Sequence, residues 1–335
     1  MKAVATQLGK IVVAEVEKPE PLAGHVLVRT EFSAISPGTE MSFVKRAADK
    51  LIVMGYSAVG VVEHVGAEAA GIEVGQRVAV YGAPYTRHAE WLSVPANLAA
   101  VVPDHVDPEE AAFAGLGAIA IHALRVAELQ FGESAVVVGL GILGNIIAQI
   151  ASAAAYRTFG MDLNADRAAM LREHGVPHAY ASQDELAAGV AEATGGVGAD
   201  AVLLCASGPG EPVINAALQS IRLRGKVVIV GDLSAQFSRE LMFGKEAQVL
   251  ISRAGGPGRY DAQYERDNID YPIGYVRWTE GRNTAEYIRL LAEGRISIKK
   301  MITNVYGLDQ VEQAYANYAQ PSKTVGTLFK FGEDR

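Results

Sequence analysis

The chain has 335 residues, of which 50% are hydrophobic and 20% are charged, and its formal net charge is −8. This length predicts about two domains, and the composition is that of a globular protein with enough apolar residues for sizeable cores. The sequence has no Lys/Arg cluster, so we expect neither a nucleic-acid nor a membrane partner. The single cysteine, Cys205, excludes an intrachain disulfide. Because no apolar run looks like a signal peptide or reaches transmembrane length, we expect a cytoplasmic protein.

The first third of the chain is predicted to be rich in β-strands. Three short β-prone runs, with Gly and Pro between them, lie at Val26–Ile35, Ala58–Val65 and Gly75–Tyr81. Frequent turn residues between short Val-rich runs favour a compact barrel over βαβ units.

The pattern changes near residue 110, where apolar runs begin to alternate with helical patterns. The apolar runs are Ser134–Val138, Arg157–Met161, Ala201–Cys205, Lys226–Val230 and Gln248–Ile251. Such strands, separated by helices, predict a parallel sheet covered on both faces. Beyond residue 252 we expect a Gly/Arg/Tyr-rich segment, then helices near 284–291 and 309–318, and a closing strand near 324–331.

A glycine-rich turn is the most specific motif. Residues 139–144 read GLGILG, directly after an apolar strand and before an apolar helix. In a dinucleotide site Gly139 permits the tight turn, Gly141 lets the pyrophosphate approach, and Gly144 lets helix and strand pack closely. The helix start, at Ile142 and Leu143, then offers free N–H groups to the phosphates. The alternative is an ordinary strand–helix turn.

An acidic residue, Asp162, ends the next predicted strand. At this distance from the glycines, a carboxylate is placed to bind the adenosine ribose and to repel a 2′-phosphate, which favours NAD over NADP. Arg167 is expected to reach the ribose or adenine edge. The alternative for Asp162 is a cap on the helix that begins near Asn164.

These features together resemble the medium-chain dehydrogenase/reductase superfamily over essentially the whole chain. The resemblance is carried by residues 32–40 (FSAISPGTE), 55–66 (GYSAVGVVEHVG), 75–80, 88–95 (HAEWLSVP), 139–144 and 323–329. It implies an α/β protein with a GroES-like β-rich catalytic domain and a Rossmann, doubly wound parallel-sheet cofactor domain. We assign residues 1–117 and 253–335 to the first domain and 118–252 to the second, with the active site in the cleft and a homodimer as the expected assembly.

The zinc ligands that the resemblance leads one to expect are missing. Pro37 occupies the position of the first ligand, Tyr56 replaces the usual His, and residues 114–117 (AGLG) supply neither Cys nor Glu. One cysteine cannot form the four-Cys structural lobe. Since zinc needs three or four converging N, S or carboxylate ligands, we expect no metal. The GYS motif, the SPGTE turn and the segment 256–280 are similar to a zinc-free subgroup with bacteriochlorophyllide dehydrogenase-like proteins and the dehydrogenase half of two-domain carbohydrate and cyclitol oxidoreductases.

Side chains must then replace the metal in managing a proton and a reacting oxygen. Tyr56 is the first candidate, and its alternative role is to fill the vacated metal cavity. Ser36, Thr39 and Glu40 lie in the facing turn and are placed to orient substrate hydroxyls, although a structural bond is the favoured role for Glu40. His122 is a further possible proton carrier.

The Gly/Arg/Tyr-rich segment is expected to pass near the nicotinamide, as this crossover does in the family. Arg253, Arg259, Tyr260 and Tyr264 suit a polyol or an anionic substrate group; the alternative is a surface loop at a subunit contact. Further cofactor contacts are expected at Ala206, Gly231, Asp232 and Lys323, the last of which has a solvated surface lysine as its alternative.

The leading functional interpretation is an NAD(H)-dependent, zinc-independent oxidoreductase acting on an alcohol or ketone, plausibly a sugar, cyclitol or polyol derivative. A quinone or enone reductase is the second interpretation, although that chemistry usually prefers NADPH. The third is a nucleotide-binding protein that has kept the fold and lost its activity.

Overall fold

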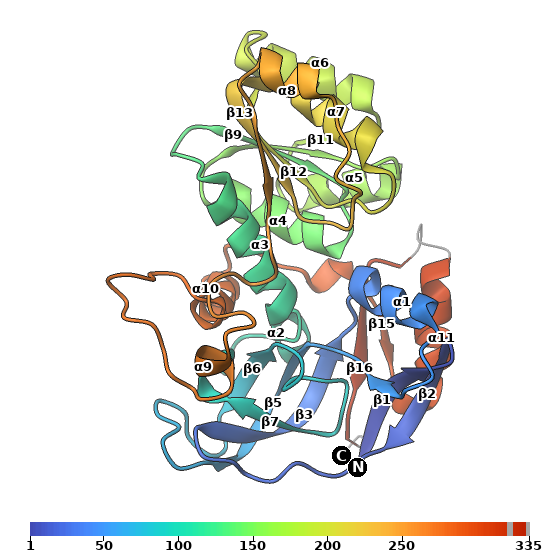
Figure 1. Ribbon diagram of the computed structural model, residues 1–335, viewed down its shortest axis with the longest axis vertical. Helices are drawn as coiled ribbons and strands as arrows, with labels where there is room; N and C mark the ends of the chain where they lie inside the picture. The colour runs from blue at the N-terminus through green and yellow to red at the C-terminus, as the bar shows by residue number, and fades with distance from the viewer. Residues whose placement is uncertain (320–323, 333–335) are drawn as a thin grey trace. The chain divides into compact units, whose positions relative to one another are not determined.

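The computed structural model describes residues 1–319 and 324–332 and divides the chain into two compact units (Figure 1). Unit 1 comprises Met1–Ala118 and Gly255–Arg335, so it is built from both ends of the chain, whereas unit 2 is the continuous segment Ile119–Ala254. In the described part of the chain, no helix is both long and apolar enough to cross a membrane.

Unit 1 is built on a seven-stranded sheet and a three-stranded sheet. The strands are β1 (Lys2–Gln7), β2 (Lys10–Glu15), β3 (His25–Ala34), β4 (Ile52–Val53), β5 (Ser57–Val65), β6 (Arg77–Tyr81), β7 (Trp91–Pro95), β8 (Ala99–Val101), β15 (Ile302–Tyr306) and β16 (Gly326–Lys330). The larger sheet has the order β15-β16-β3-β5-β6-β8, with β7 also paired to β3, and the smaller has the order β2-β1-β4. Strand β3 pairs with β5, β7 and β16, and most of its residues are buried, including the polar Thr30 and Ser33.

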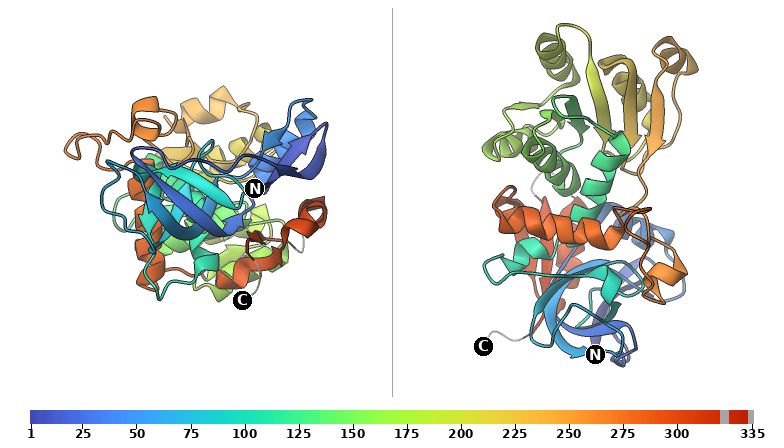
Figure 2. Two further views of the ribbon diagram at one scale, coloured as in Figure 1. Left: turned by 90° about the horizontal axis from the view of Figure 1, so that it is seen from below. Right: turned by 90° about the vertical axis from the view of Figure 1, so that its left-hand side faces the viewer.

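Six helices belong wholly or partly to unit 1, counting only α-helices in the described residues. They are α1 (Pro37–Arg46), α2 (Pro108–Ala111), α3 (Ala114–Ala127), α9 (Ala262–Glu265), α10 (Glu280–Ala292) and α11 (Val311–Ala316). Helix α10, drawn in orange in Figure 2, packs against strands β6 and β8. Its N-terminus is capped by Thr279, whose hydroxyl accepts from the Arg282 backbone N–H.

Helix α1 corrects one expectation, because residues 37–40 begin a helix and do not form a turn. Pro37 occupies the first turn, where its missing N–H costs nothing, and Glu40 favours the positive end of the helix dipole. A Ser-Pro-Gly sequence is typical of turns as well as of helix starts, so the local pattern did not distinguish the two.

Unit 2 is a six-stranded sheet in which all the described pairings are parallel. Its strands are β9 (Ser134–Val138), β10 (Arg157–Met161), β11 (His178–Tyr180), β12 (Ala199–Leu204), β13 (Ile221–Ile229) and β14 (Gln248–Ile251). Its further helices are α4 (Ile142–Ala153), α5 (Ala165–Glu173), α6 (Gln183–Thr194), α7 (Gly210–Ser220) and α8 (Arg239–Gly244). The order β11-β10-β9-β12-β13-β14 is that of a Rossmann fold, with its switch point between β9 and β12.

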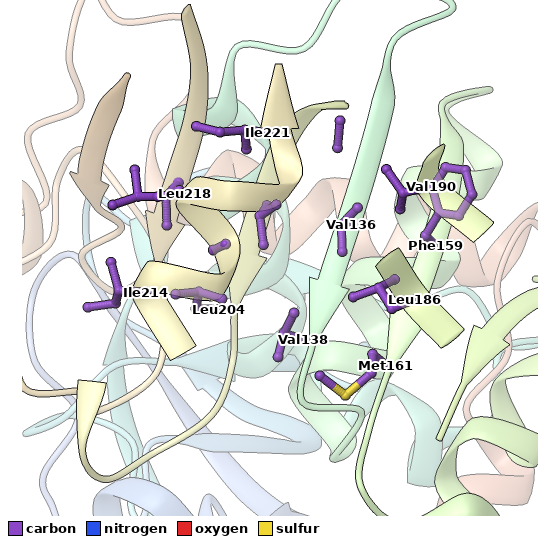
Figure 3. Packing of buried hydrophobic residues seen from close by; sticks show 14 of the residues in the cluster. Val136, Val138, Phe159, Met161, Leu186, Val190, Leu204, Ile214, Leu218 and Ile221 are labelled. Carbon is purple, nitrogen blue, oxygen red and sulfur yellow. The ribbon is translucent and has the colours of Figure 1, made fainter. Parts of the chain in front are cut away.

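The fold class predicted from the sequence is therefore confirmed: a GroES-like β-rich unit and a Rossmann unit. Side chains of α6 and α7 pack on one face of the parallel sheet (Figure 3). Leu186 and Leu218 lie in this core with Val136 and Phe159, and all four are almost completely buried. At about 25 cal/mol per Å² of apolar surface removed from water, such a core is the main contribution to the stability of the unit.

Candidate functional site

The glycine turn of unit 2 has a backbone that only glycine supports at two positions. Gly139 has φ +93°, in the left-handed region. A Cβ on Gly144 would lie 1.8 Å from the Gly139 carbonyl oxygen, closer than any contact permits. At Gly141, by contrast, a Cβ would meet no atom within 4 Å. The first and third glycines are thus needed for the turn itself, whereas the middle one leaves open space beside the backbone.

Helix α4 begins at this turn. Gly141 is its N-cap residue, and no side chain in the described residues caps it. The N–H groups of Ile142, Leu143 and Gly144 are among those that a helix leaves unpaired at its start, and with the helix dipole they form an anion site. These residues fit the pyrophosphate of a dinucleotide.

Asp162 lies directly beside the glycine turn. Its Oδ2 accepts from the Leu140 N–H at 2.8 Å and from Arg167 Nη1 at 3.3 Å, and its Oδ1 accepts from the Asn164 N–H at 2.9 Å. The carboxylate therefore fixes the turn, and it also orients Arg167 and the chain entering α5. The capping alternative is wrong, because Asn164 itself is the residue whose side chain caps α5.

Two of the other predicted cofactor residues meet at the carboxyl edge of the sheet. A Cβ on Gly231 would lie 2.0 Å from the Ala206 carbonyl oxygen, and one on Gly139 would lie 3.1 Å from the Ala206 N–H nitrogen. The segments after β9, β12 and β13 are thus in direct contact at the switch point, where such folds bind ligands. Asp232 follows in an exposed position. Lys323 lies outside the described residues.

In unit 1, Tyr56 and Ser36 form a hydroxyl pair. The Tyr56 hydroxyl donates to Ser36 Oγ at 2.6 Å. Burial raises the pKa of Tyr56 above its ordinary value, and hydrogen bonds from Ser36 and Thr39 oppose this only in part. Tyr56 therefore keeps its proton near neutral pH and acts as a donor. Thr39 is exposed on the first turn of α1.

Glu40 has the structural role that the sequence favoured, and its candidate role in orienting substrate hydroxyls or in catalysis is wrong. Its side chain is 1% exposed. Oε1 accepts from the Ser36 N–H at 2.7 Å, and Oε2 lies 3.0 Å from His88 Nε2 and accepts from the Tyr315 hydroxyl. Both oxygens are engaged, so Glu40 fixes the backbone of Ser36 and thereby the hydroxyl pair.

The residues at the expected zinc positions do not fit a zinc ion. Pro37 has no donor atom, and the Tyr56 hydroxyl is already bonded to Ser36. Ser57, next to Tyr56, donates to the Ala112 carbonyl at 2.6 Å and accepts from the Gly115 N–H at 2.8 Å. Within the described residues, no three His, Cys, Asp or Glu side chains are grouped to hold a metal.

The segment after residue 255 folds against Tyr81, the last residue of β6. The Tyr56 and Tyr81 rings meet edge to face with centroids 5.9 Å apart. Arg259 lies 5.7 Å from the Tyr81 ring and 4.3 Å from the Tyr260 ring. Its guanidinium pairs with Glu265 and donates to the Ala83 carbonyl at 2.7 Å. Tyr260 is exposed at 58%, so it is available to a ligand, whereas Arg259 is largely committed to internal bonds.

Tyr264 is a core residue, and its assignment to substrate binding is wrong. It is 2% exposed, stacks on Tyr271, and donates to Thr279 Oγ1 at 2.8 Å. The Gly/Arg/Tyr-rich stretch has the composition of a binding loop, which is why Tyr264 was predicted to bind substrate. In the structure Tyr264 lies on a short helix, α9, and its side chain is buried.

Two other predicted residues belong to unit 2. Arg253 is exposed and already has a partner. His122 is half-buried on α3, and burial together with nearby Arg125 lowers its pKa below the ordinary value. His122 is thus neutral near pH 7 and able to accept a proton.

Sequence reasoning missed three buried polar residues of unit 1. His88 is fully buried between Glu40 and Ser33. Tyr81 is 2% exposed against Tyr56. Glu280 is 0% exposed, and neither of its oxygens has a hydrogen-bond partner among the described residues. Of the three, only His88 could have been singled out from the sequence, because it begins the segment HAEWLSVP that carries part of the family resemblance.

Two protein families match this chain. The alcohol dehydrogenase GroES-like domain matches residues 22–124, and the zinc-binding dehydrogenase domain matches residues 142–266. Among curated relatives, 2-dehydro-3-deoxy-L-galactonate 5-dehydrogenase of Pseudoalteromonas atlantica is 26% identical over 330 residues, covering 89% of each chain.

Solved structures have the same fold. Galactitol-1-phosphate dehydrogenase of Escherichia coli matches with a TM-score of 0.80 and 18% identity, covering 99% of this chain and 100% of that one. A short chain alcohol dehydrogenase of Escherichia coli CFT073, in complex with its cofactor NADH, matches with a TM-score of 0.79 and 21% identity over 99% of each chain.

Proposed function

Because the chain belongs to the medium-chain alcohol dehydrogenase-like superfamily, we propose that it is an NAD(H)-dependent oxidoreductase that interconverts an alcohol and a ketone without zinc. The observation that carries the proposal is the Tyr56–Ser36 hydroxyl pair, which stands where the superfamily resemblance leads one to expect metal ligands. A hydroxyl held in place by a second hydroxyl would supply the proton and the hydrogen bond to the reacting oxygen, which a zinc ion would otherwise manage.

The proposed cofactor is NAD(H), which supplies or accepts the hydride when bound. The open space at Gly141 and the start of α4 would hold its pyrophosphate. Asp162 would accept from the ribose hydroxyls while it keeps its bond to the Leu140 N–H. A carboxylate at this point repels the 2′-phosphate of NADP.

Tyr56 is the proposed proton donor to the carbonyl oxygen in the reduction direction. Its raised pKa keeps the hydroxyl protonated near neutral pH, so a proton is present for donation and a role as a general base is disfavoured. Ser36, whose Oγ accepts a hydrogen bond from the Tyr56 hydroxyl, holds the phenol in one orientation. Glu40 accepts from the Ser36 backbone N–H and thereby holds Ser36 in place. In the full reaction the ketone gains a hydride and a proton and becomes the alcohol.

The proposed substrate is a sugar, cyclitol or other polyol derivative. Two of the relatives reported above are named as dehydrogenases of 2-dehydro-3-deoxy-L-galactonate and of galactitol 1-phosphate. Exposed Thr39 and Tyr260 add hydroxyl groups next to the Tyr56–Ser36 pair, and both interact with Tyr56. Hydroxyl-bearing substrates are recognised by such groups, because each substrate hydroxyl needs a partner when water is removed.

The proposal is tested by following NADH oxidation with ketosugars, inososes and quinones, before and after dialysis against a chelator. We expect turnover with a polyhydroxy ketone, tighter binding of NADH than of NADPH, and no loss of rate after chelation. Stoichiometric zinc in the active enzyme, or turnover of quinones alone, would refute it.

A further inference from the structure

A cavity lies in unit 1, among residues that the proposed reaction does not use. Its volume is about 550 Å³, and it opens between the start of the chain, the segment around Lys50 to Val53, and the segment from Tyr85 to Trp91. Every residue that lines it belongs to unit 1. The cavity is therefore complete within that unit.

The cavity contains an uncompensated positive charge. Arg87 lines it and is half-buried, yet within the described residues its guanidinium makes no hydrogen bond or ion pair. Burial and the nearby Arg259 guanidinium lower the pKa of Arg87 from its ordinary value. A guanidinium stays charged in proteins, so this site keeps a partly desolvated cation that a bound anion would stabilise.

The remaining walls combine charge at the rim with an apolar surface. Among the charged side chains that line the cavity, exposed Lys50 and Glu17 have opposite charges and leave Arg87 as the excess charge, while the Met1 ammonium pairs with Glu15. Tyr85, Trp91 and Val53 provide apolar surface, and the Trp91 ring already carries the Lys18 ammonium at 3.3 Å from its centroid. The Arg87 guanidinium and the Tyr85 and Trp91 rings thus line the same cavity.

We propose that this cavity binds a small organic anion, with its carboxylate or phosphate group on Arg87 and its apolar part against Tyr85 and Trp91. The planar fork of an arginine can donate two parallel hydrogen bonds to either group. The proposal does not depend on the reaction proposed above, because none of these residues belongs to the glycine turn or to the Tyr56–Ser36 pair.

The test uses tryptophan fluorescence, because the chain has two tryptophans. In a Trp278→Phe variant only Trp91 reports, and it lines the cavity. We expect benzoate to change this signal saturably and benzyl alcohol, its neutral analogue, to have little effect. Inorganic phosphate, added as a competitor, distinguishes the two head groups: competition indicates a site for either anion, and its absence a site for carboxylates.

Variants of Arg87, the residue proposed to bind the carboxylate or phosphate group, decide the proposal. In the Trp278→Phe background, Arg87→Gln should weaken benzoate binding by about tenfold or more, since a charged hydrogen-bonded pair is lost. Lys10→Gln removes the same charge from unit 1 outside the cavity and should leave binding within about twofold. Arg87→Lys, which keeps the charge without the fork, should be intermediate and serves if the Gln variant does not fold. Equal binding of benzoate and benzyl alcohol, or unchanged affinity in Arg87→Gln, would overturn the proposal.

Discussion

The hydroxyl of Tyr56 is the single group on which the proposed proton transfer depends. Replacing Tyr56 with Phe keeps the ring against Tyr81 and removes the donor. We expect kcat for ketone reduction to fall by about 10²-fold or more, as is usual for the loss of a general acid. Steady-state kinetics and an NADH titration measure the effect, and the affinity for NADH should not change.

Tyr156→Phe is the matched control, because it removes a hydroxyl that makes only a 3.4 Å bond to the Leu129 carbonyl in unit 2. It should retain the wild-type kcat. If Tyr56→Phe also retained full turnover, Tyr56 would have no part in the chemistry and would only fill space.

Glu280 gives a prediction about stability. Burial, with a smaller contribution from Glu265 and against the opposing effect of Arg259, raises the pKa of Glu280 to about 9. Between about pH 4.5 and 9 the folded chain keeps a proton that the unfolded chain releases, so the free energy of unfolding falls as the pH rises. The contribution of this group is fully present below about pH 4.5 and is lost by about pH 9.

Glu280→Gln replaces the protonated carboxyl with a neutral group and should remove this pH dependence. The free energy of unfolding, measured with urea, should rise relative to the wild type by about 2–4 kcal/mol more at pH 8 than at pH 5. Any constant cost of burying the amide cancels in this difference. Exposed Glu192→Gln is the control, with an expected change below about 0.5 kcal/mol. A difference that does not vary with pH would contradict the assignment.

At the scale of elements, two glycines of the turn before α4 have different roles: Gly144 is needed for folding and Gly141 for the proposed binding of the cofactor. A Cβ at Gly144 would collide with the Gly139 carbonyl, whereas one at Gly141, where φ is −61°, would meet nothing within 4 Å. Gly144→Ala should therefore destabilise the protein by about 1–3 kcal/mol. Gly141→Ala should leave stability within about 0.5 kcal/mol and weaken NADH binding by about tenfold or more, since the methyl group would occupy the approach to the phosphates.

Thermal unfolding and an NADH titration measure the two effects separately. Wild-type affinity in Gly141→Ala would mean that the pyrophosphate does not lie on this turn.

Elements whose burial is uniform could be predicted from the sequence. Runs such as Ser134–Val138 and Arg157–Met161 coincide with β9 and β10, because a strand covered on both faces is largely apolar. Strand β13 begins earlier than predicted, at Ile221. Its first half has exposed charged residues, so the hydrophobic pattern did not include it.

Side-chain partners could not be predicted in the same way. Glu40 and His88 are 48 positions apart in sequence, and nothing local pairs them. Glu280 stands at the start of a helix, where an acidic residue is ordinary, and its burial arises from packing with distant segments such as Gly255 and Tyr81.

For the molecule as a whole, the continuity of unit 2 leads to a further prediction. Its parallel sheet is complete within one segment of the chain. We expect a fragment of residues 114–254 to unfold cooperatively and to bind NADH, as shown by calorimetry and titration. A fragment of residues 1–118 should fail to fold, because it lacks β15, β16 and α10. A non-cooperative first fragment would show that unit 2 requires unit 1.

The pairing of β3 with β16 joins Phe32–Ala34 to Leu328–Lys330, and it has a consequence for biosynthesis. Residues His25–Arg29 can pair with β7 early in translation, but the edge of β3 at Phe32–Ala34 has no partner until almost all of the protein has been synthesised. A nascent chain of this kind exposes an unpaired strand edge for most of its translation, and we expect it to bind chaperones. A premature stop codon that removes only the last strand should therefore cause aggregation, even though every residue proposed to take part in the reaction would still be present.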